Sequence, residues 1–562
     1  MRDEITVMFG GEAGQGVETA GELLAKSLVR SGLRIVVSRE YMSRIRGGHN
    51  TFAVRAGAGE IRAPREAVDI LVAMNEETIS IDSPRLSAEG ELLDASGSAA
   101  AEGAIGLPTK DLAPPRYANT VASAVAASLV GIEEDVFAGA VADAFGKKGD
   151  QVVEANREAV RAAYGWASEN WKGHLRLAQP SDAPKRLMIE GNTAVALGAI
   201  SAGVRFAAFY PMTPSTSINL VLARHAEELG LVVEQAEDEI AAINMAIGAS
   251  FAGARAMVAT SGGGFALMTE GVSLAAMTET PIVIVVVQRP GPATGLPTRT
   301  AQEDLEFVLH AGHGEFPRAV LAPGSPEECF HLTRKAFDLA ERSQGPVFVL
   351  SDQFLADSYR AVEPFDLEAL PPVARPGDSE PTERPYRRYE LVEGGVSPRL
   401  VPGAGLDLVV ADSDEHDESG HITEDLALRN RMVDKRLAKM SVMREDVSRP
   451  VLSGADDYET LIVSWGSTAG AAAEAAEMLR AEGASASALH FPQVWPLARE
   501  QFLPALEKAK RVVCVEGNAT GQFARLVRRE TGFVMESLGR HDGLAITPEY
   551  TVRGLTRAGV PK

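Results

Sequence analysis

Apolar residues in this chain fall in short runs, separated by segments whose apolar positions recur at helical spacing. In the first part of the chain such runs predict strands, and residues 17–30 predict a helix. Strands that alternate with helices are typical of a parallel sheet, so we expect a mostly parallel α/β domain over residues 1–165. The predicted strands cover residues 5–9, 33–37, 51–54 and 68–73.

A second α/β unit is expected over residues 187–360, after a polar stretch that contains Gly173, Pro180 and Pro184. Its most apolar run, at residues 281–287, is far shorter than the roughly 20 residues that span a bilayer. That run is typical of a buried parallel strand. The predicted strands are residues 206–210, 231–235, 256–260, 282–287, 319–321 and 347–350, with a helix at 238–252.

The remaining chain divides into a connecting segment and a third domain. Residues 361–458 begin with a stretch rich in Pro, Gly and charge, which is too long for an ordinary loop and indicates a crossing segment. Residues 459–562 form a smaller α/β domain. Its predicted strands are residues 461–465, 486–491 and 512–516, with a helix at 469–481. The expected fold class is therefore α/β, with three parallel-sheet domains.

Composition narrows the class of protein further. The sequence has 55 basic and 77 acidic side chains, a net charge of −22, which argues against a nucleic-acid-binding surface. Cys329 and Cys514 are its two cysteines, too few for a disulfide framework or for the four ligands of an iron–sulfur cluster. Acidic residues stand where a signal peptide would be basic. We expect a soluble cytoplasmic protein that does not enter a membrane.

Two loops in the first domain contain residues suited to binding an anion. Gly11, Gly14 and Gly16 follow the first strand and open a helix, where backbone N–H groups can approach a phosphate. Their spacing differs from the dinucleotide fingerprint, and a tight strand-to-helix turn explains them equally well. Arg46 and Gly47 lie in a second such loop, which reads either as a phosphate contact or as a solvated loop.

Polar loops follow several strands of the second domain. Each loop alone fits an ordinary turn, but the carboxyl ends of parallel strands meet at one edge, where ligands bind in open α/β sheets. An arginine beyond a buried strand suits a carboxylate, or else an ion pair that fixes the loop. The candidate residues are Tyr210, Pro211 and Thr213 in one loop, Gly262 and Gly263 in another, and Arg289 and Thr298 in a third.

Glu239 is a further candidate. The acidic residues around positions 234–239 are mostly explained by the start of a helix, because the helix dipole favours negative charge there. Glu239 differs because it precedes an apolar run, residues 240–248, that would bury its surroundings.

Taken in order, these motifs resemble the α subunits of 2-oxoacid:ferredoxin oxidoreductases. The similar segments are Tyr-Pro-Met-Thr-Pro-Ser, Glu-Asp-Glu-Ile-Ala-Ala-Ile, Ala-Thr-Ser-Gly-Gly-Gly-Phe and Arg-Pro-Gly-Pro-Ala-Thr-Gly-Leu-Pro-Thr. The first 165 or so residues resemble the γ subunit of that family, fused ahead of α. Residues 414–421, with Lys435, Arg436 and Lys439, resemble its 2-oxoglutarate branch. The family often has other residues at Ala13, Met212, Gly263 and Ala293.

The resemblance implies a thiamine-diphosphate pyrimidine-binding domain and a transketolase C-terminal-like domain. It also implies a separate β subunit that holds Mg²⁺ and a [4Fe–4S] cluster and shares the thiamine diphosphate, in an (αβ)₂ heterotetramer, with no metal held by this chain. The implied reaction is oxidative decarboxylation of 2-oxoglutarate with CoA to succinyl-CoA, with reversible reduction of ferredoxin. Pyruvate or a branched-chain 2-oxoacid is the alternative substrate. A transketolase-like transferase and a non-catalytic CoA- or nucleotide-binding scaffold are the alternative functions.

The resemblance also assigns roles to residues. Glu239 matches the carboxylate that contacts the aminopyrimidine ring, and Thr213, Arg289 and Thr298 match positions that hold the substrate. Arg299, Arg318 or a cation of the β subunit would meet the second carboxylate of 2-oxoglutarate, since a buried unpaired charge is very costly. The implied cofactor-side residues are Tyr210, Pro211, Gly262 and Gly263, and the CoA candidates are Gly11, Gly14, Gly16, Arg46 and Gly47.

Overall fold

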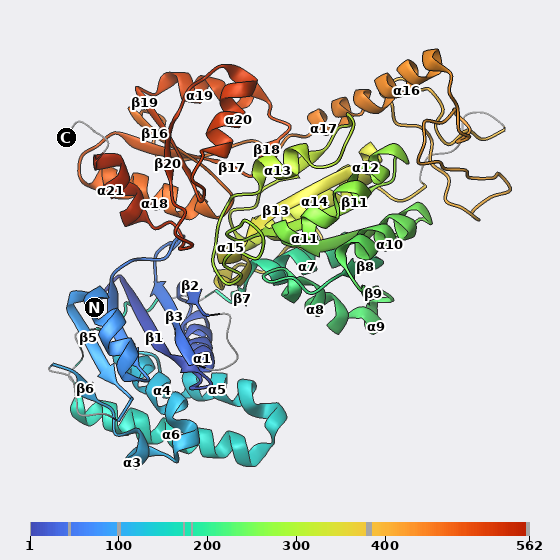
Figure 1. The fold of residues 1–562 in the computed structure, drawn as a ribbon. Helices are drawn as coiled ribbons and strands as arrows, with labels where there is room; N and C mark the ends of the chain where they lie inside the picture. The colour runs from blue at the N-terminus through green and yellow to red at the C-terminus, as the bar shows by residue number, and fades with distance from the viewer. Residues whose placement is uncertain are drawn as a thin grey trace. The chain divides into compact units, whose positions relative to one another are not determined.

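A computed structural model describes residues 2–42, 47–97, 103–171, 173, 175–180, 184–377 and 385–557. The chain divides into two compact units (Figure 1). The first unit contains Met1–Glu190, Asp357–Leu367 and Thr547–Glu549. The second contains Gly191–Ala356, Glu368–Ile546 and Tyr550–Lys562.

An eight-stranded sheet forms the centre of the first unit, in the order β6-β5-β4-β1-β3-β2-β14-β7. Helix α1 (Val17–Arg30) packs on β1 and β3, and α4 (Ala118–Val130) and α5 (Glu134–Phe145) pack against α1. Helix α6 (Asp150–Asn170) lies against α4 and α5. The strands are β1 (Glu4–Ala13), β2 (Arg34–Glu40), β3 (Gly47–Gly57), β4 (Val68–Ala73), β5 (Leu86–Asp94), β6 (Ile105–Gly106), β7 (Leu187–Ile189) and β14 (Arg360–Val362).

The expectation of a mostly parallel first sheet is wrong. Strand β3 is antiparallel to both β1 and β2, and β14 is antiparallel to β2 and β7, while β1, β4, β5 and β6 pair in parallel. The connection from Glu40 to Gly47 is too short for a crossover, which takes a dozen or more residues, so the two strands form a hairpin. The sequence pattern showed the strands without showing their direction.

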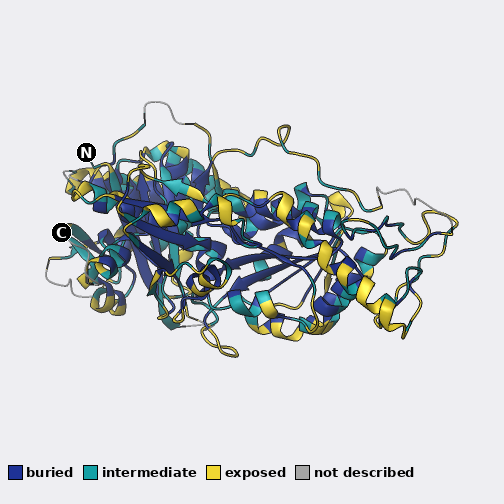
Figure 2. Ribbon diagram, turned by 90° about the horizontal axis from the view of Figure 1, so that it is seen from above, coloured by how far each residue is buried: buried dark blue, intermediate teal, exposed yellow. Residues whose placement is uncertain are grey.

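A seven-stranded sheet forms the first part of the second unit, in the order β18-β12-β13-β11-β10-β8-β9. Strand β11 lies in its interior, with every residue buried and parallel neighbours on both sides. Figure 2 shows most strands in the dark blue of buried residues, and the exposed residues mainly on helices and loops. Among the described residues, the strand pairs of this sheet are parallel except β12 with β18. The strands are β8 (Phe206–Phe209), β9 (Val232–Gln235), β10 (Ala256–Thr260), β11 (Ile282–Gln288), β12 (Ala319–Leu321), β13 (Pro346–Asp352) and β18 (Gln493–Trp495).

Helices link these strands as the sequence pattern predicts. Helix α10 follows β9, and α11 and α12 follow β10. Because these strands are parallel, the segments that leave them all begin at the same edge of the sheet. The helices are α7 (Gly191–Ser201), α8 (Thr216–Arg224), α10 (Glu239–Phe251), α11 (Gly262–Leu267), α12 (Thr269–Met277), α13 (Leu305–His310) and α14 (Pro326–Ser343).

A five-stranded sheet, in the order β15-β17-β16-β19-β20, forms the rest of the second unit. Its central strands β16, β17 and β19 are parallel, and Trp465 and Phe491 join the same apolar core as β11. Strand β18 follows β17 directly but adds to the edge of the seven-stranded sheet. The elements are β15 (Val451–Ser453), β16 (Thr460–Trp465), β17 (Ala486–Phe491), β19 (Arg511–Glu516), β20 (Glu536–Gly539), α18 (Ala469–Ala481), α19 (Leu503–Lys508), α20 (Gln522–Thr531) and α21 (Pro548–Arg557).

An α/β fold with three sheets is thus confirmed, and strands 256–260, 319–321 and 486–491 have the predicted bounds. Residues at both ends of the predicted second domain belong elsewhere, because β7 and β14 extend the sheet of the first unit. In the described part of the chain, no helix is both long and apolar enough to cross a membrane.

The crossing segment is anchored to the second unit by buried charge. Its helix α16 (Leu426–Ala438) carries Lys435, whose Nζ donates to both carboxylate oxygens of Glu279, at 2.6 and 2.7 Å. Lys439 pairs with the same carboxylate at 2.5 Å, and Arg388 donates to the Glu279 carbonyl. Burial alone would raise the pKa of Glu279, but Lys439 and Lys435 hold it well below its usual range.

We expect Glu279→Gln to destabilise the chain by about 3–5 kcal/mol, because it leaves two buried ammonium groups without their partner. Thermal unfolding of the purified chain measures the effect. The control is Glu445→Gln, which breaks the more exposed ion pair with Arg342 and should cost no more than about 1 kcal/mol. Equal effects of the two substitutions would contradict an anchoring role for Glu279.

Candidate active site

Glu239 is a buried carboxylate with an unused acceptor. It is the first residue of α10, and Asp238 caps that helix by accepting a hydrogen bond from the Ala241 amide at 2.7 Å. Glu239 is therefore not needed as a cap. Its side chain is 3% exposed, and its Oε1 atom is buried without a hydrogen-bond partner. Burial raises the pKa of Glu239. An unsatisfied buried carboxylate oxygen costs free energy unless a ligand donates to it.

The structure brings Arg289 and Thr213 together from different loops. Arg289 directly follows β11, and its Nη1 donates to the Thr213 carbonyl at 2.6 Å. Among the described residues, the Arg289 side chain makes no other hydrogen bond. Burial lowers the pKa of Arg289, and the nearby Asp304 partly opposes that change. A partly desolvated guanidinium held by one nitrogen has donors left for a carboxylate.

The loop after Arg289 is folded back on itself. Gly295 has a φ of 52°, and a Cβ there would lie 1.8 Å from the Pro290 carbonyl oxygen, so the loop requires glycine at this position. Ala293 also adopts a positive φ, of 55°. The loop ends at Thr300, whose hydroxyl donates to the buried Asp352 carboxylate at 3.1 Å. Thr298 is partly buried within this loop.

The glycines at the start of α11 are explained by close approach of two carboxylates. A Cβ on Gly264 would lie 2.5 Å from Glu239 Oε1, and a Cβ on Gly262 would lie 2.3 Å from Asp304 Oδ2. Gly263 between them is exposed and has the Ala293 carbonyl 3.6 Å from the position of a Cβ. Glycine at 262 and 264 therefore makes room for side chains of this protein.

Asp304 was missed by the sequence reasoning. It precedes α13 but makes no side-chain cap, and its Oδ2 atom is buried without a hydrogen-bond partner. Burial raises the pKa of Asp304 to about 6, with Glu303 adding to the shift and Arg289 opposing it. One sequence signal could have pointed to it: two polar residues, Gln302 and Asp304, come shortly after the proline-rich loop.

Gln302 ties this loop to the third domain. Its backbone N–H donates to the Gly517 carbonyl at 2.7 Å, and its side-chain Oε1 accepts a hydrogen bond from the Gly517 amide at 2.8 Å. Its Nε2 also donates to the Trp465 carbonyl at 2.8 Å. The five-stranded sheet therefore fixes the end of the loop that begins at Arg289.

The other sequence candidates in this unit lie in varied surroundings. Tyr210 is 40% exposed, and Pro211 is exposed beside it. Arg299 is partly buried in the loop. Arg318 donates to the carbonyls of Val308 and Ala311 at 2.9 and 2.6 Å. The Arg318 guanidinium therefore holds its own segment together, which argues against a role in binding substrate.

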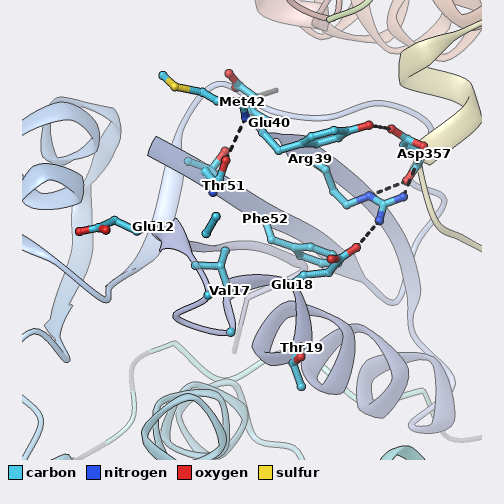
Figure 3. Close-up of a pocket in the computed structure, with 15 residues that line it drawn as sticks. Glu12, Val17, Glu18, Thr19, Arg39, Glu40, Met42, Thr51, Phe52 and Asp357 are labelled. Carbon is cyan, nitrogen blue, oxygen red and sulfur yellow. Dashed lines mark hydrogen bonds and ion pairs between the residues drawn. The ribbon is translucent and has the colours of Figure 1, made fainter. Parts of the chain in front are cut away.

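The first unit contains a cavity of about 490 Å³ (Figure 3). Gly14, Gly16 and Val17 line it at the start of α1, together with residues of β2 and β3. Gly16 caps α1 with a φ of 80°. Arg39 lines the cavity too, and its guanidinium is held by Glu18 at 2.8 Å and by the Asp357 carbonyl at 3.1 Å. The remaining charged lining residues, Glu12 and Glu40, are acidic.

The other candidates of the first unit do not line this cavity in the described part of the chain. Gly11 lies within β1, opposite Asn50 of β3, and does not line the cavity. Gly47 begins β3 and pairs with Ala13, which does line it. Arg46 lies outside the described residues.

Comparison with known protein families gives three matches along the chain. Residues 197–435 match the thiamine-diphosphate-binding domain of pyruvate flavodoxin/ferredoxin oxidoreductases. Residues 6–166 match the pyruvate ferredoxin/flavodoxin oxidoreductase family, and residues 454–530 match the transketolase C-terminal domain.

Similar proteins agree with these matches. A 2-oxoacid:ferredoxin oxidoreductase subunit alpha of a Sulfolobus species is 33% identical, over 93% of this chain and 92% of its own. A 2-oxoglutarate synthase subunit KorA of Methanothermobacter marburgensis is 37% identical, over 61% of this chain and 91% of its own. A solved 2-oxoglutarate:ferredoxin oxidoreductase from Magnetococcus marinus is 32% identical, covers 99% of this chain and 100% of that chain, and has a TM-score of 0.93.

The fold and these matches thus define a thiamine-diphosphate-dependent oxidoreductase. The chain belongs to the 2-oxoacid:ferredoxin oxidoreductase family, whose similar members are named as α subunits. A subunit name implies that other subunits complete the enzyme.

The unpaired Asp304 carboxylate predicts a pH-dependent stability. Because the pKa of Asp304 is raised from 3.8 to about 6 on folding, the folded chain binds more protons and loses stability as pH rises through this range. We expect Asp304→Asn to have little effect at pH 4 and to stabilise the chain by up to about 3 kcal/mol at pH 8. Thermal unfolding at several pH values measures this. A substitution effect that does not change with pH would contradict the assignment.

Proposed function

We propose that this chain is the α subunit of a 2-oxoglutarate:ferredoxin oxidoreductase. With a partner subunit it would convert 2-oxoglutarate and CoA to succinyl-CoA and CO₂ while reducing ferredoxin, in either direction. The observation that carries the proposal is the unpartnered, buried Glu239 carboxylate at the same sheet edge as Arg289. The names of the KorA relatives and of the Magnetococcus enzyme support 2-oxoglutarate as the substrate.

The residues at this edge fit thiamine diphosphate. When bound, the cofactor supplies a nucleophilic carbanion and an electron sink for decarboxylation. Glu239 Oε1 would accept a hydrogen bond from the aminopyrimidine ring and hold a proton at the ring nitrogen. Its burial favours this, because a desolvated carboxylate binds a proton-bearing group more strongly than a solvated one. Gly264 permits the position of Glu239, while Gly263, Tyr210 and Pro211 remain candidates for further contacts with the cofactor.

Arg289 would bind the 2-oxoacid carboxylate. The Thr213 carbonyl holds one guanidinium nitrogen and so orients the group toward the site. The Thr213 hydroxyl and Thr298 would contact the carboxylate and the 2-oxo oxygen. Since Arg318 is bonded to backbone carbonyls, Arg299 or a cation of the partner subunit would meet the distal carboxylate.

CoA would bind in the cavity of the first unit. Gly14 and Gly16 lie at the start of α1, where backbone amides and the helix dipole favour an anion. The described lining is more acidic than basic, and Arg39 is already held by Glu18 and Asp357. A CoA diphosphate would therefore depend on these glycines and on Arg46. Gly11, within β1, and Gly47, at the start of β3, do not line the cavity and are the less direct candidates.

The partner would be a β subunit. We propose that it holds the [4Fe–4S] cluster and the Mg²⁺–diphosphate part of the cofactor site, passes electrons to ferredoxin, and assembles with this chain as (αβ)₂. The two cysteines of this chain, Cys329 and Cys514, are both buried and too few to hold such a cluster alone.

We expect Glu239→Gln to lower turnover of the reconstituted complex by about 10²–10⁴-fold, because glutamine keeps the shape but cannot carry the charge. The assay uses saturating thiamine diphosphate, and gel filtration checks assembly. The matched control is Glu237→Gln, which removes an exposed carboxylate two residues away. Near-normal turnover of Glu239→Gln would refute its role.

The substrate assignment is tested by kcat/KM for 2-oxoglutarate, pyruvate and 2-oxoisovalerate on the same complex. We expect 2-oxoglutarate to be preferred, because a cation in the pocket would be left unpaired by either monocarboxylate. A preference for pyruvate or 2-oxoisovalerate would overturn the substrate while leaving the family unchanged.

A further inference from the structure

We propose that Asp304 is a positioning residue that competes with the substrate carboxylate for the charge of Arg289, so that a proton on Asp304 favours substrate binding. The inference rests on the proposed function, since it takes Arg289 as the group that binds the 2-oxoacid carboxylate.

The Asp304 side chain is placed for an electrostatic role and not for capping. An aspartate at this position of a helix usually accepts a hydrogen bond from the first-turn amides, but Asp304 makes no such bond to α13. Its backbone amide is held by Gln288 Oε1 at 2.9 Å, which fixes where the residue lies. The Oδ2 atom lies against the backbone of Gly262, buried and without a partner.

The charged groups around Asp304 leave Arg289 as its counter-charge. Glu303 precedes it on the same segment and raises its pKa, while Arg289, from the loop after β11, acts in the opposite direction. Glu306 of α13 faces Arg525 of α20, which pairs with it. Glu239 of α10 lies against Gly264, two residues beyond Gly262 on α11.

The interaction between Asp304 and Arg289 is electrostatic and not a formed ion pair. Arg289 donates its hydrogen bond to the Thr213 carbonyl, and Asp304 Oδ2 has no partner within the described residues. Arg289 is therefore available to a substrate carboxylate, but an ionised Asp304 would repel that carboxylate and attract the same guanidinium.

Proton binding and substrate binding are consequently linked. A pKa of about 6 means that Asp304 is mostly protonated at pH 5.5 and mostly ionised at pH 8. Substrate affinity is then highest at the lower pH and falls as pH rises through 6. By reciprocity, a bound substrate carboxylate favours uptake of a proton by Asp304.

The test compares Asp304→Asn with the unmodified complex from pH 5.5 to 8. Asparagine keeps the shape and resembles the protonated carboxyl group. We expect the two enzymes to have nearly the same kcat/KM at pH 5.5. At pH 8, kcat/KM of the variant should be about 5 to 20 times that of the unmodified complex. The change should come through KM with kcat nearly constant. The matched control is Glu306→Gln, which removes an acidic charge from the adjoining helix and should give a pH-independent ratio.

Two further measurements separate the possible outcomes. Affinity for N-oxalylglycine, an unreactive analogue of 2-oxoglutarate, should follow the same pH dependence in a calorimeter, with proton uptake that Asp304→Asn abolishes. In an Arg289→Ala background, Asp304→Asn should no longer alter KM at any pH.

If Arg289→Ala impairs substrate use but the ratio for Asp304→Asn does not depend on pH, Asp304 is structural and this inference is wrong while the proposed function stands. If Arg289→Ala uses the 2-oxoacid normally, the proposed role of Arg289 fails first and the role of Asp304 fails with it.

Discussion

Parallel pairing of β8, β10 and β11 is the constraint on which the candidate site depends. Parallel strands end at a common edge, so Thr213, the start of α11 and Arg289 meet there although they are far apart in sequence. The complete burial of β11 stabilises this arrangement, because its apolar side chains are covered on both faces of the sheet. A shift of β11 against its neighbours would move Arg289 away from the Thr213 carbonyl.

The sequence predicted the parts of the fold that have local signals. Buried runs such as residues 256–260 and the helix at 469–481 are recognisable from periodicity alone. Strand direction has no such signal, which is why the hairpin of β2 and β3 was taken for parallel strands. The position of β18 was missed because pairing with β12 depends on contacts distant in sequence.

The same distinction applies to the site. The convergence of the loops after β8, β10 and β11 could be predicted because each loop follows a strand of one parallel sheet, and the burial of Glu239 could be predicted from the apolar run that follows it. Asp304 could not, because an acidic residue before a helix is usually a cap. Only the three-dimensional arrangement shows that Asp304 faces Gly262 instead of its own helix. The buried pair of Lys435 and Glu279 is likewise invisible in sequence, since 156 positions separate the two residues.

The third domain holds the loop after Arg289 near its end. The Thr300 backbone N–H donates to the Gly543 carbonyl at 3.1 Å. Gln302 is bonded to Trp465 and Gly517, and Asn518 donates to the Gln302 carbonyl at 3.0 Å. The buried Glu516 carboxylate orders that corner by accepting from the Phe523 amide at 2.8 Å. Because the loop is held at Gln302 and by Arg289, the chain between them is fixed at both ends. The transketolase C-terminal-like domain therefore holds the far end of the loop that begins at Arg289.

Two carboxylates flank the first turn of α11 and differ in their surroundings. Glu239 approaches Gly264 and is almost completely buried, whereas Asp304 approaches Gly262 and lies within the field of Arg289. Both have a raised pKa and an unpaired oxygen, yet only Asp304 has a cation near enough to oppose the shift. Paired carboxylates in unlike environments commonly divide the work of a site between them. Gly262 and Gly264 of this turn provide the space that the two carboxylates require.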